Sequence, residues 1–115
     1  MESKIQMEYR YLGNTGLRVS AFSFGNMVNH MVEDPQASTN EIIKKCLDYG
    51  INFFDTAETY SHGMAEVYLG QAFIDLKVKR EDIVVTTKIF FGDQDFTKRC
   101  FSHINSSGLS RKHII

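Results

Sequence analysis

The sequence has few of the features that mark several classes of protein. It has two cysteines, Cys46 and Cys100, and no Cys-x-x-Cys pair or cysteine–histidine cluster that would indicate zinc, so no metal site is expected. The net charge of −1 gives no indication of nucleic-acid or membrane-surface binding. No apolar run approaches the ~18 residues of a membrane span, so membrane insertion is not expected. The N-terminal residues lack the apolar core of a signal peptide. We therefore expect a cytoplasmic protein.

Proline is rare, with one in the chain, so this proline and the glycines in turn sequences help to divide the chain. The 115 residues suggest one domain. Two short alternating runs flank the turn sequence Gly13-Asn14-Thr15-Gly16, which predicts a β-hairpin over residues 7–20. A short strand is expected at residues 21–25, followed at 26–37 by a polar loop that holds the single proline.

Helical and strand patterns alternate in the next part of the chain. Ser38 and Glu41 have the spacing of a capping box, and Gly50 supplies a helix stop. The residues of that helix predicted to face the core are Ile42, Ile43, Cys46 and Leu47. A buried strand is expected at residues 51–54 and another at 83–91. Between them, a second amphipathic helix is predicted from Ala65, Leu69, Ala72, Phe73 and Leu76.

This β-α-β-α-β order predicts a parallel α/β sheet with right-handed crossovers. A doubly wound sheet and a (β/α)₈ barrel both fit, although the strand-to-helix turns lack the GxGxxG nucleotide fingerprint. In either fold, functional residues lie at the carboxyl ends of the strands. That rule selects Gly25 with the loop after it, Asp55 with Tyr60, and Lys88 with Phe90 and Phe91.

The last part of the chain reads as a long polar loop, residues 92–109, and the start of a helix at residues 110–115 with Ser110 as its N-cap. One helical turn is not stable alone, because nucleation orders several residues for one hydrogen bond. We therefore expect residues 1–115 to be the N-terminal part of a larger domain, truncated after the third strand.

Asp55, Tyr60 and Lys88 together suggest proton-transfer chemistry. A free phenol has a pKa near 10, and a neighbouring ammonium lowers it. A carboxylate would hold that ammonium in place, and the phenol could then protonate a carbonyl oxygen as a hydride arrives from a nicotinamide. Each residue also has a simpler interpretation, as a turn cap, a surface aromatic and a lysine at a strand end with its head in water.

Three stretches resemble the aldo-keto reductase family: YRYLGNTGLRVSAFSFG, GINFFDTAETYSHGMAEVYLG and IVVTTK. They look like the family's N-terminal hairpin and first strand, its second strand with active-site loop and helix, and its third strand with the catalytic lysine. The ending GLSRKHII, residues 108–115, most resembles the branch that holds the β-subunits of voltage-gated potassium channels.

The resemblance implies a role for each site residue. Tyr60 would be the proton donor, Lys88 would lower its pKa, and Asp55 would pair with Lys88. The residues implied to contact the nicotinamide end of NADP(H) are Gly25, Asn26, Met27 and Asp55, although Asn26-Met27 departs from the family's usual Gly-Thr. Phe90 and Phe91 would face the substrate.

The same resemblance implies the whole protein. Its fold would be a (β/α)₈ TIM barrel with the hairpin as an N-terminal plug, of which residues 1–115 are a partial NADP-dependent oxidoreductase domain. It would reduce aldehydes or ketones by hydride transfer, with this part of the chain inactive alone. The alternative is a channel β-subunit-like regulatory or scaffold protein. A homo-oligomer or an association with a channel is left open.

Overall fold

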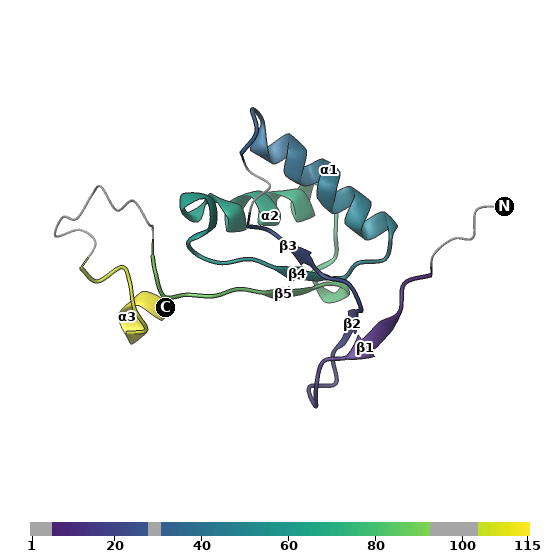
Figure 1. Cartoon of the computed structure of the whole chain (residues 1–115), viewed down its shortest axis with the longest axis horizontal. Helices are drawn as coiled ribbons and strands as arrows, with labels where there is room; N and C mark the ends of the chain where they lie inside the picture. Colours follow the sequence, from purple (N-terminus) through teal and green to yellow (C-terminus); the bar gives the residue numbers. More distant parts are fainter. Residues whose placement is uncertain (1–5, 28–30, 93–103) are drawn as a thin grey trace.

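The computed structural model describes residues 6–27, 31–92 and 104–115 (Figure 1). In these residues two strands pair antiparallel, β1 (Tyr9–Tyr11) and β2 (Arg18–Ser20). A parallel sheet has the order β3 (Phe24–Gly25), β4 (Phe53–Asp55), β5 (Val84–Thr86). The α-helices are α1 (Pro35–Asp48), α2 (Met64–Asp75) and α3 (Arg111–Ile114). Two 3₁₀ turns, η1 (Tyr60–Gly63) and η2 (Arg80–Asp82), precede α2 and β5.

The predicted hairpin and the predicted parallel α/β order are confirmed. Gly13 and Gly16 both have positive φ, and the Leu12 amide donates to the Leu17 carbonyl at 2.9 Å, which closes the hairpin turn. β4 pairs parallel with both β3 and β5. The first helix ends as expected, since Gly50 follows the C-cap with a φ of +82°.

The prediction of where α1 begins was wrong. Asp34, not Ser38, is the N-cap, and its Oδ1 accepts a hydrogen bond from the Ala37 amide at 3.0 Å. Pro35 stands in the first turn, where its fixed φ suits a helix and its missing N–H costs no bond. Part of the predicted 26–37 loop is therefore helix.

The predicted strands are shorter in the structure. β5 ends at Thr86, so Lys88, Phe90 and Phe91 follow the strand instead of ending it. In the described residues β5 pairs with β4 alone, and β4 ends at Asp55, the register partner of Thr86. Beyond Thr86 the two described segments stay linked by a single backbone–backbone bond, from the Glu58 amide to the Lys88 carbonyl at 3.0 Å, which does not extend the strand. The loop predicted at 92–109 lies largely in residues 93–103, outside the described residues, as does Cys100. Ser110 is confirmed as the N-cap of α3.

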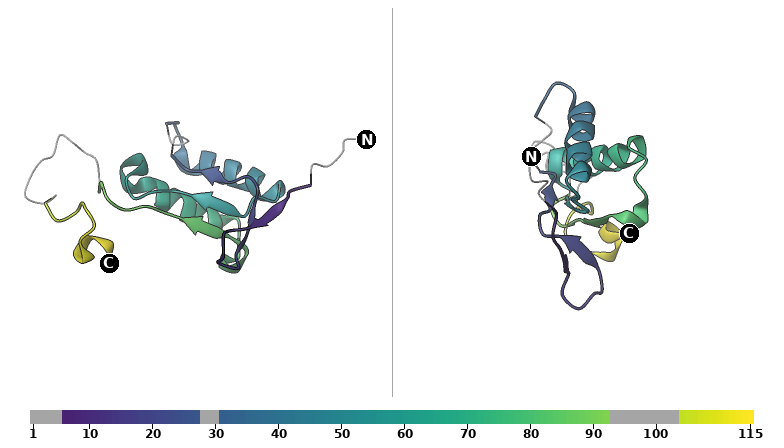
Figure 2. Two further views of the ribbon diagram at one scale, coloured as in Figure 1. Left: turned by 60° about the horizontal axis from the view of Figure 1, so that its bottom comes forward. Right: turned by 90° about the vertical axis from the view of Figure 1, so that its right-hand side faces the viewer.

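Both long helices cover the same face of the parallel sheet (Figures 1 and 2). Ile43 and Cys46 from α1 meet Leu69 and Ala72 from α2 over Phe54 of β4. Phe54 is fully buried and makes edge-to-face contacts with Phe24 and Phe73. Phe53 and Asp55, its neighbours in β4, point to the other face of the strand and are only half-buried. The sequence predicted that both faces of this strand would be buried, but only the face of Phe54 is.

The hairpin is attached near the amino ends of the parallel strands. The Tyr9 hydroxyl donates to the Gly50 carbonyl at 2.7 Å. The Asn52 side chain accepts from the Ser20 amide at 2.8 Å and donates to the Arg18 carbonyl at 3.1 Å. A Cβ at Gly50 would lie 2.8 Å from the Tyr9 hydroxyl, so the Tyr9 side chain would have to shift, and the φ of +82° itself favours glycine. No described helix is long and apolar enough to cross a bilayer.

Candidate active site

The carboxyl ends of the three parallel strands meet on one line. Gly25 of β3 is the register partner of Asp55 in β4, and Asp55 is the partner of Thr86 in β5. Side chains that follow these positions therefore share one edge of the sheet, as the sequence predicts. This edge, opposite the hairpin, is called the rim below.

Asp55 and Lys88 form an ion pair on the rim. The Lys88 Nζ donates to the Asp55 Oδ2 at 2.7 Å and to the Thr56 carbonyl at 2.8 Å. The Thr86 Oγ1 donates to the Asp55 Oδ1 at 2.6 Å. Both carboxylate oxygens are thus occupied, which fixes the position of Asp55 and, through it, of the lysine head.

The electrostatics of the pair keep both groups charged. Partial burial would raise the pKa of Asp55, but hydrogen bonds from Lys88 and Thr86 outweigh it and hold that pKa below the ordinary 3.8. The hydrogen bond to Asp55 raises the pKa of Lys88 above the ordinary 10.5, against a smaller effect of desolvation. The lysine is therefore a cation at any pH near neutrality.

Tyr60 lies beside this pair. The Lys88 Nζ is 5.2 Å from the centroid of the Tyr60 ring, within cation–π distance. Tyr60 opens η1, in which Ser61 and His62 have φ of 50° and 53°, and Gly63 follows at 87°. These left-handed residues turn the chain sharply from β4 into α2, and so hold Tyr60 at the rim. The structure therefore brings together the three residues that the sequence selected.

A shallow pocket opens over these groups. Its volume is about 300 Å³, and its lining includes Tyr60, Lys88, Phe90 and Phe91. Phe90 and Phe91 are half exposed and pack edge to face, with ring centroids 5.1 Å apart. The surface of the pocket is mainly apolar, with Tyr60 and Lys88 among its lining residues, a combination typical of small-molecule sites.

The residues after β3 differ in their surroundings. Gly25 is exposed with open space around its Cα, and Met27 is exposed. Asn26 is fully buried; its Nδ2 donates to the Ala65 carbonyl at 2.8 Å and its backbone amide to the Asp55 carbonyl at 2.9 Å. Asn26 therefore anchors the first turn of α2 to the end of β3, a contact that the sequence analysis did not foresee.

Glu58 and His113 were also missed. Glu58 lies between Asp55 and Tyr60, and its carboxylate bonds the Gly92 amide at 3.1 Å and faces the His113 ring. His113 lies in the ending GLSRKHII and Glu58 in the stretch GINFFDTAETYSHGMAEVYLG, both of which resemble the family, but neither residue was assigned a role from the sequence. Their contact joins residues 55 positions apart, so no local pattern could have found it.

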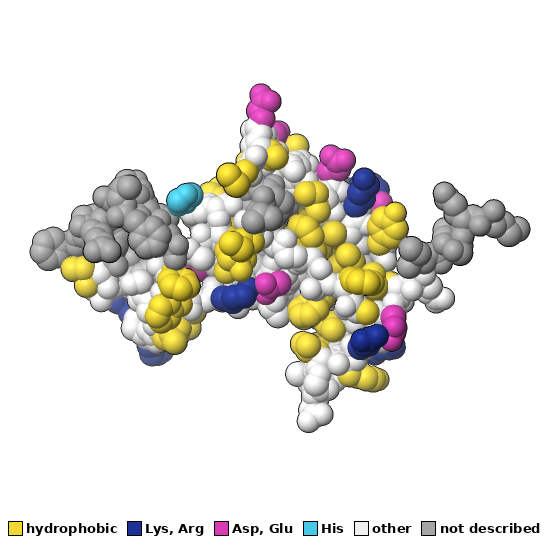
Figure 3. All heavy atoms as spheres, viewed as in Figure 1, with side chains coloured by type: hydrophobic (Ala, Val, Ile, Leu, Met, Phe, Trp, Pro, Cys, Tyr) yellow, Lys and Arg dark blue, Asp and Glu magenta, His cyan; other side chains and the backbone are white. Residues whose placement is uncertain are grey.

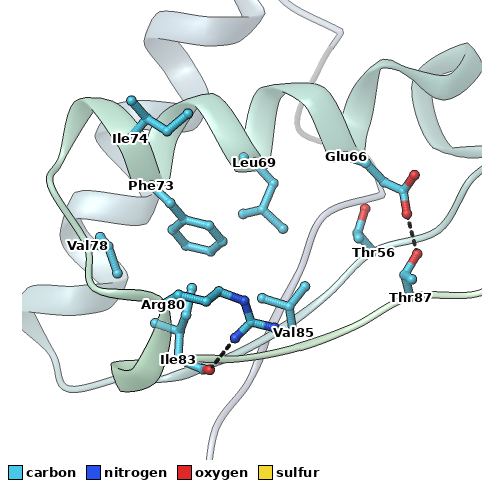
Figure 4. Close-up of a pocket in the computed structure, with 11 residues that line it drawn as sticks. Thr56, Glu66, Leu69, Phe73, Ile74, Val78, Arg80, Ile83, Val85 and Thr87 are labelled. Carbon is cyan, nitrogen blue, oxygen red and sulfur yellow. Dashed lines mark hydrogen bonds between the residues drawn. The ribbon is translucent and has the colours of Figure 1, made fainter.

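A second hollow lies between α2 and β5 (Figure 4). This groove, of about 430 Å³, is lined mainly by apolar side chains that include Leu69, Phe73 and Val85. Its polar groups are engaged locally: Glu66 accepts from the Thr87 hydroxyl, and Arg80 donates to the Ile83 carbonyl. We assign no chemistry to it.

The distribution of charged side chains and of possible metal ligands indicates no further site in the described residues. On the face shown in Figure 3, acidic and basic side chains are interspersed among hydrophobic ones. Within residues 6–27, 31–92 and 104–115, no group of three or more His, Cys, Asp or Glu side chains could hold a metal ion.

The fold and the rim define a class of α/β proteins in which consecutive parallel strands carry a carboxylate, a tyrosine and a lysine at their carboxyl ends. The chain belongs to the Aldo/keto reductase family, whose sequence profile matches residues 22–115. The match begins before β3 and includes every rim residue described above.

Relatives with known names support this membership. The chain is 43% identical over 109 residues to proteins named "Probable voltage-gated potassium channel subunit beta" from Oryza sativa subsp. japonica and from Arabidopsis thaliana. Each alignment covers 95% of this chain and 31% of the relative, so the chain spans about a third of the length of these curated relatives.

A solved structure is similar as well. Aldo-keto reductase AKR11C1 from Bacillus halodurans, in its holo form, superposes with a TM-score of 0.65 at 34% identity. The superposition covers 76% of this chain and 27% of that one. The fold shared by the described residues is therefore that of the corresponding part of an aldo-keto reductase.

Proposed function

We propose that the protein is an NADP(H)-dependent aldo-keto reductase, a cytoplasmic oxidoreductase that reduces aldehydes or ketones. One observation carries the proposal: the Lys88 ammonium lies between the Asp55 carboxylate, at 2.7 Å, and the Tyr60 ring, at 5.2 Å. A phenol beside a fixed cation, at the edge of a small pocket, suits proton transfer to a carbonyl oxygen.

Each of the three residues has a separate role. The Tyr60 hydroxyl donates its proton to the substrate oxygen as negative charge develops there. The Lys88 ammonium stabilises the phenolate that remains. Asp55 is held by Thr86 and holds Lys88, so the cation stays beside the ring without reorganising during the reaction.

The residues at the rim fit the nicotinamide end of the cofactor. Gly25 presents open main chain, Met27 presents an exposed apolar side chain, and the Asp55 carboxylate lies in register between β3 and β5. In this proposal Gly25, Asn26 and Met27 border the nicotinamide, with Asn26 acting as the buried anchor of that segment. The cofactor, when bound, supplies the hydride.

Phe90 and Phe91 form the substrate side of the pocket. Phe90 and Phe91 are 52% and 60% exposed, and as neighbours they present a continuous apolar surface at the pocket. We propose that a small carbonyl substrate packs its apolar part against these rings.

The wider fold follows from the same proposal. The three parallel strands are the first three of a (β/α)₈ barrel, and the hairpin closes its amino-terminal end as a plug. The attachment of the hairpin near the start of β4, through Asn52, supports this arrangement. Residues 1–115 are then a partial NADP-dependent oxidoreductase domain.

The test removes the Tyr60 hydroxyl from a protein that contains the complete barrel. Tyr60→Phe keeps the ring, so aldehyde turnover should fall roughly 10²–10⁴-fold, the usual contribution of a positioned acid, while NADPH affinity stays within a few-fold. Lys88→Met should also cripple turnover, because the phenolate loses its cation. Tyr49→Phe, the same change on an exposed tyrosine at the end of α1, is the matched control.

Normal turnover in Tyr60→Phe would overturn the mechanism. The same assay on the 115-residue chain alone is expected to give no turnover, because this chain would carry only the first three strands of the proposed barrel.

A channel-associated regulatory protein is the second candidate, favoured by the names of the 43%-identical relatives. It predicts co-purification with a voltage-gated potassium channel that survives Tyr60→Phe. A protein that binds no channel but reduces aldehydes would reject it.

A further inference from the structure

Glu58 binds the segment after β5 through both its main chain and its side chain. Its backbone N–H donates to the Lys88 carbonyl at 3.0 Å. Its Oε2 accepts from the Phe90 amide at 3.3 Å and from the Gly92 amide at 3.1 Å. One residue therefore contacts alternate residues of the stretch that carries the catalytic lysine and the substrate-side phenylalanines.

The same carboxylate reaches the first turn of α3. The Glu58 Oε1 faces the His113 Nε2, and the His113 Nδ1 faces the Gly108 carbonyl at 2.7 Å. The Gly108 amide in turn donates to the Phe90 carbonyl at 2.6 Å. Glu58, Phe90, Gly108 and His113 thus form a closed ring of hydrogen bonds across three segments, called the Glu58 ring below.

The two neighbours of the imidazole determine its charge. Both ring nitrogens of His113 face oxygen acceptors, so both can donate only if the ring is an imidazolium. The Gly108 carbonyl, and after it the Glu58 carboxylate, raise the pKa of His113 against the opposing effect of desolvation. In the described residues, Glu58 is the charged side chain that pairs with the His113 ring. Arg111 and Lys112 lie in the same turn of α3 as His113.

The pair is also shielded from water. The side chain of His113 is 7% exposed and that of Glu58 is 26% exposed, against 54% for Lys88. Shielded, charge-assisted hydrogen bonds are among the stronger ones in proteins. Lys88, the proposed catalytic lysine, has a long and exposed side chain. Its ammonium group keeps its position only if the main chain of residue 88 is held in place.

We propose that Glu58 is a positioning residue of the active site. It holds the main chain of residues 88–92 against the loop that carries Tyr60, so that the Lys88 ammonium stays between Asp55 and the phenol. Through His113 it also couples α3 to the site. This inference rests on the proposed reductase function for its kinetic consequence, but the geometry it predicts can be measured without turnover.

The experiment uses Glu58→Ala and Glu58→Gln in the protein with its complete barrel, with Glu41→Gln as the control. Glu41 is an exposed carboxylate on α1, away from the rim. Glutamine keeps an oxygen acceptor for the Phe90 and Gly92 amides, whereas alanine removes it. Titration of the His113 ring by NMR first checks that the Glu58 ring is broken: the pKa should fall towards its ordinary range in both Glu58 variants.

The deciding measurement is the titration of Lys88 through its ε-carbon shift. In the wild type its pKa should be raised by Asp55, and in Glu58→Ala it should move back towards 10.5 as the pair loosens. Glu58→Gln should keep most of the shift. An unchanged Lys88 titration in folded Glu58→Ala would overturn the positioning role.

Turnover supplies the second readout. For an aldehyde, kcat should fall roughly 10–10²-fold in Glu58→Ala, the usual effect of misplacing a catalytic group, with NADPH affinity unchanged and partial recovery in Glu58→Gln. Wild-type kcat in Glu58→Ala would also overturn the role. If the wild type reduces no aldehyde, the proposed function fails, and the Lys88 titration still decides the positioning of its ammonium.

Discussion

Lys88 and Asp55 form an exposed ion pair, and in the proposed reductase this pair contributes to chemistry more than to stability. Their side chains are 54% and 37% exposed, so water screens most of their attraction. Exposed pairs of this kind contribute about 0–1 kcal/mol to folding. What the pair supplies is a fixed cation 5.2 Å from the centre of the Tyr60 ring.

Asp55→Asn tests this view at the residue scale. Without the carboxylate, the pKa of Lys88 should fall towards its ordinary value, turnover should drop sharply, and the free energy of unfolding should change by less than about 1 kcal/mol. NMR titration, an aldehyde assay and urea unfolding measure the three quantities. Asp75→Asn, which alters a carboxylate bonded to Asn40 and Gln71 far from the rim, is the control. A large loss of stability in Asp55→Asn would assign the pair a structural role instead.

The pH range of the pair follows from the directions of its pKa shifts. The pKa of Asp55 is lowered, so its stabilising effect is present above 3.8 and is lost as pH falls through the lower value. The pKa of Lys88 is raised, so its effect is present below 10.5 and is lost as pH rises through the higher value. The pair is therefore intact across the neutral range.

At the scale of single elements, the start of α1 separates two candidate caps. Ser38 has the capping-box spacing with Glu41, but Asp34 makes the cap bond and Pro35 begins the helix. The Asp-Pro pair at residues 34–35, inside the stretch predicted as a loop, is itself a helix-start signal, and it competed with the capping-box signal of Ser38 and Glu41.

Replacing Asp34 or Ser38 with alanine shows which of the two residues caps α1. Asp34→Ala should cost about 1 kcal/mol of folding stability, because the Ala37 amide loses its acceptor. Ser38→Ala should be neutral or stabilising by up to about 0.5 kcal/mol, since alanine is the better residue inside a helix. Thermal or urea unfolding of the two variants measures the difference. Equal losses would show that Asp34 has no special role at this end.

At the scale of the whole molecule, Asn52 joins the hairpin to the parallel sheet. Its side chain accepts from the Ser20 amide and donates to the Arg18 carbonyl. Its backbone amide donates to the Ser20 hydroxyl. Ser20 is buried, so its amide would have no ready replacement for this acceptor. Together with the bond from the Tyr9 hydroxyl to the Gly50 carbonyl, Asn52 therefore attaches the hairpin to the segment before β4.

Asn52→Ala should cost about 1–3 kcal/mol, the usual penalty for leaving partly buried polar groups without partners. Hydrogen exchange should show the largest loss of protection at the Ser20 amide. Asn40→Ala, which removes an exposed link between α1 and α2, should cost less and leave Ser20 protected. Unchanged exchange at Ser20 in Asn52→Ala would contradict the proposed connection.

The sequence by itself determined the order and type of the elements and the position of the rim, but not the start of α1 or the lengths of the strands. Local signals carry them: the Gly13–Gly16 turn, the apolar spacing of α1 and α2, and Gly50 as a stop. The rule that parallel strands end on one edge then placed Asp55, Tyr60 and Lys88 together, and the structure has them in contact.

The tertiary structure alone decided the rest. The length of β5 depends on where its partner β4 ends, the burial of Asn26 depends on α2, and the Glu58 ring joins residues 55 positions apart. Such contacts leave no periodic trace in the sequence, because each partner satisfies its hydrogen bonds with a group that only folding brings near. The physical reason is distance along the chain: propensity and spacing act over a few residues, whereas the position of Lys88 is set by residues from three separate segments.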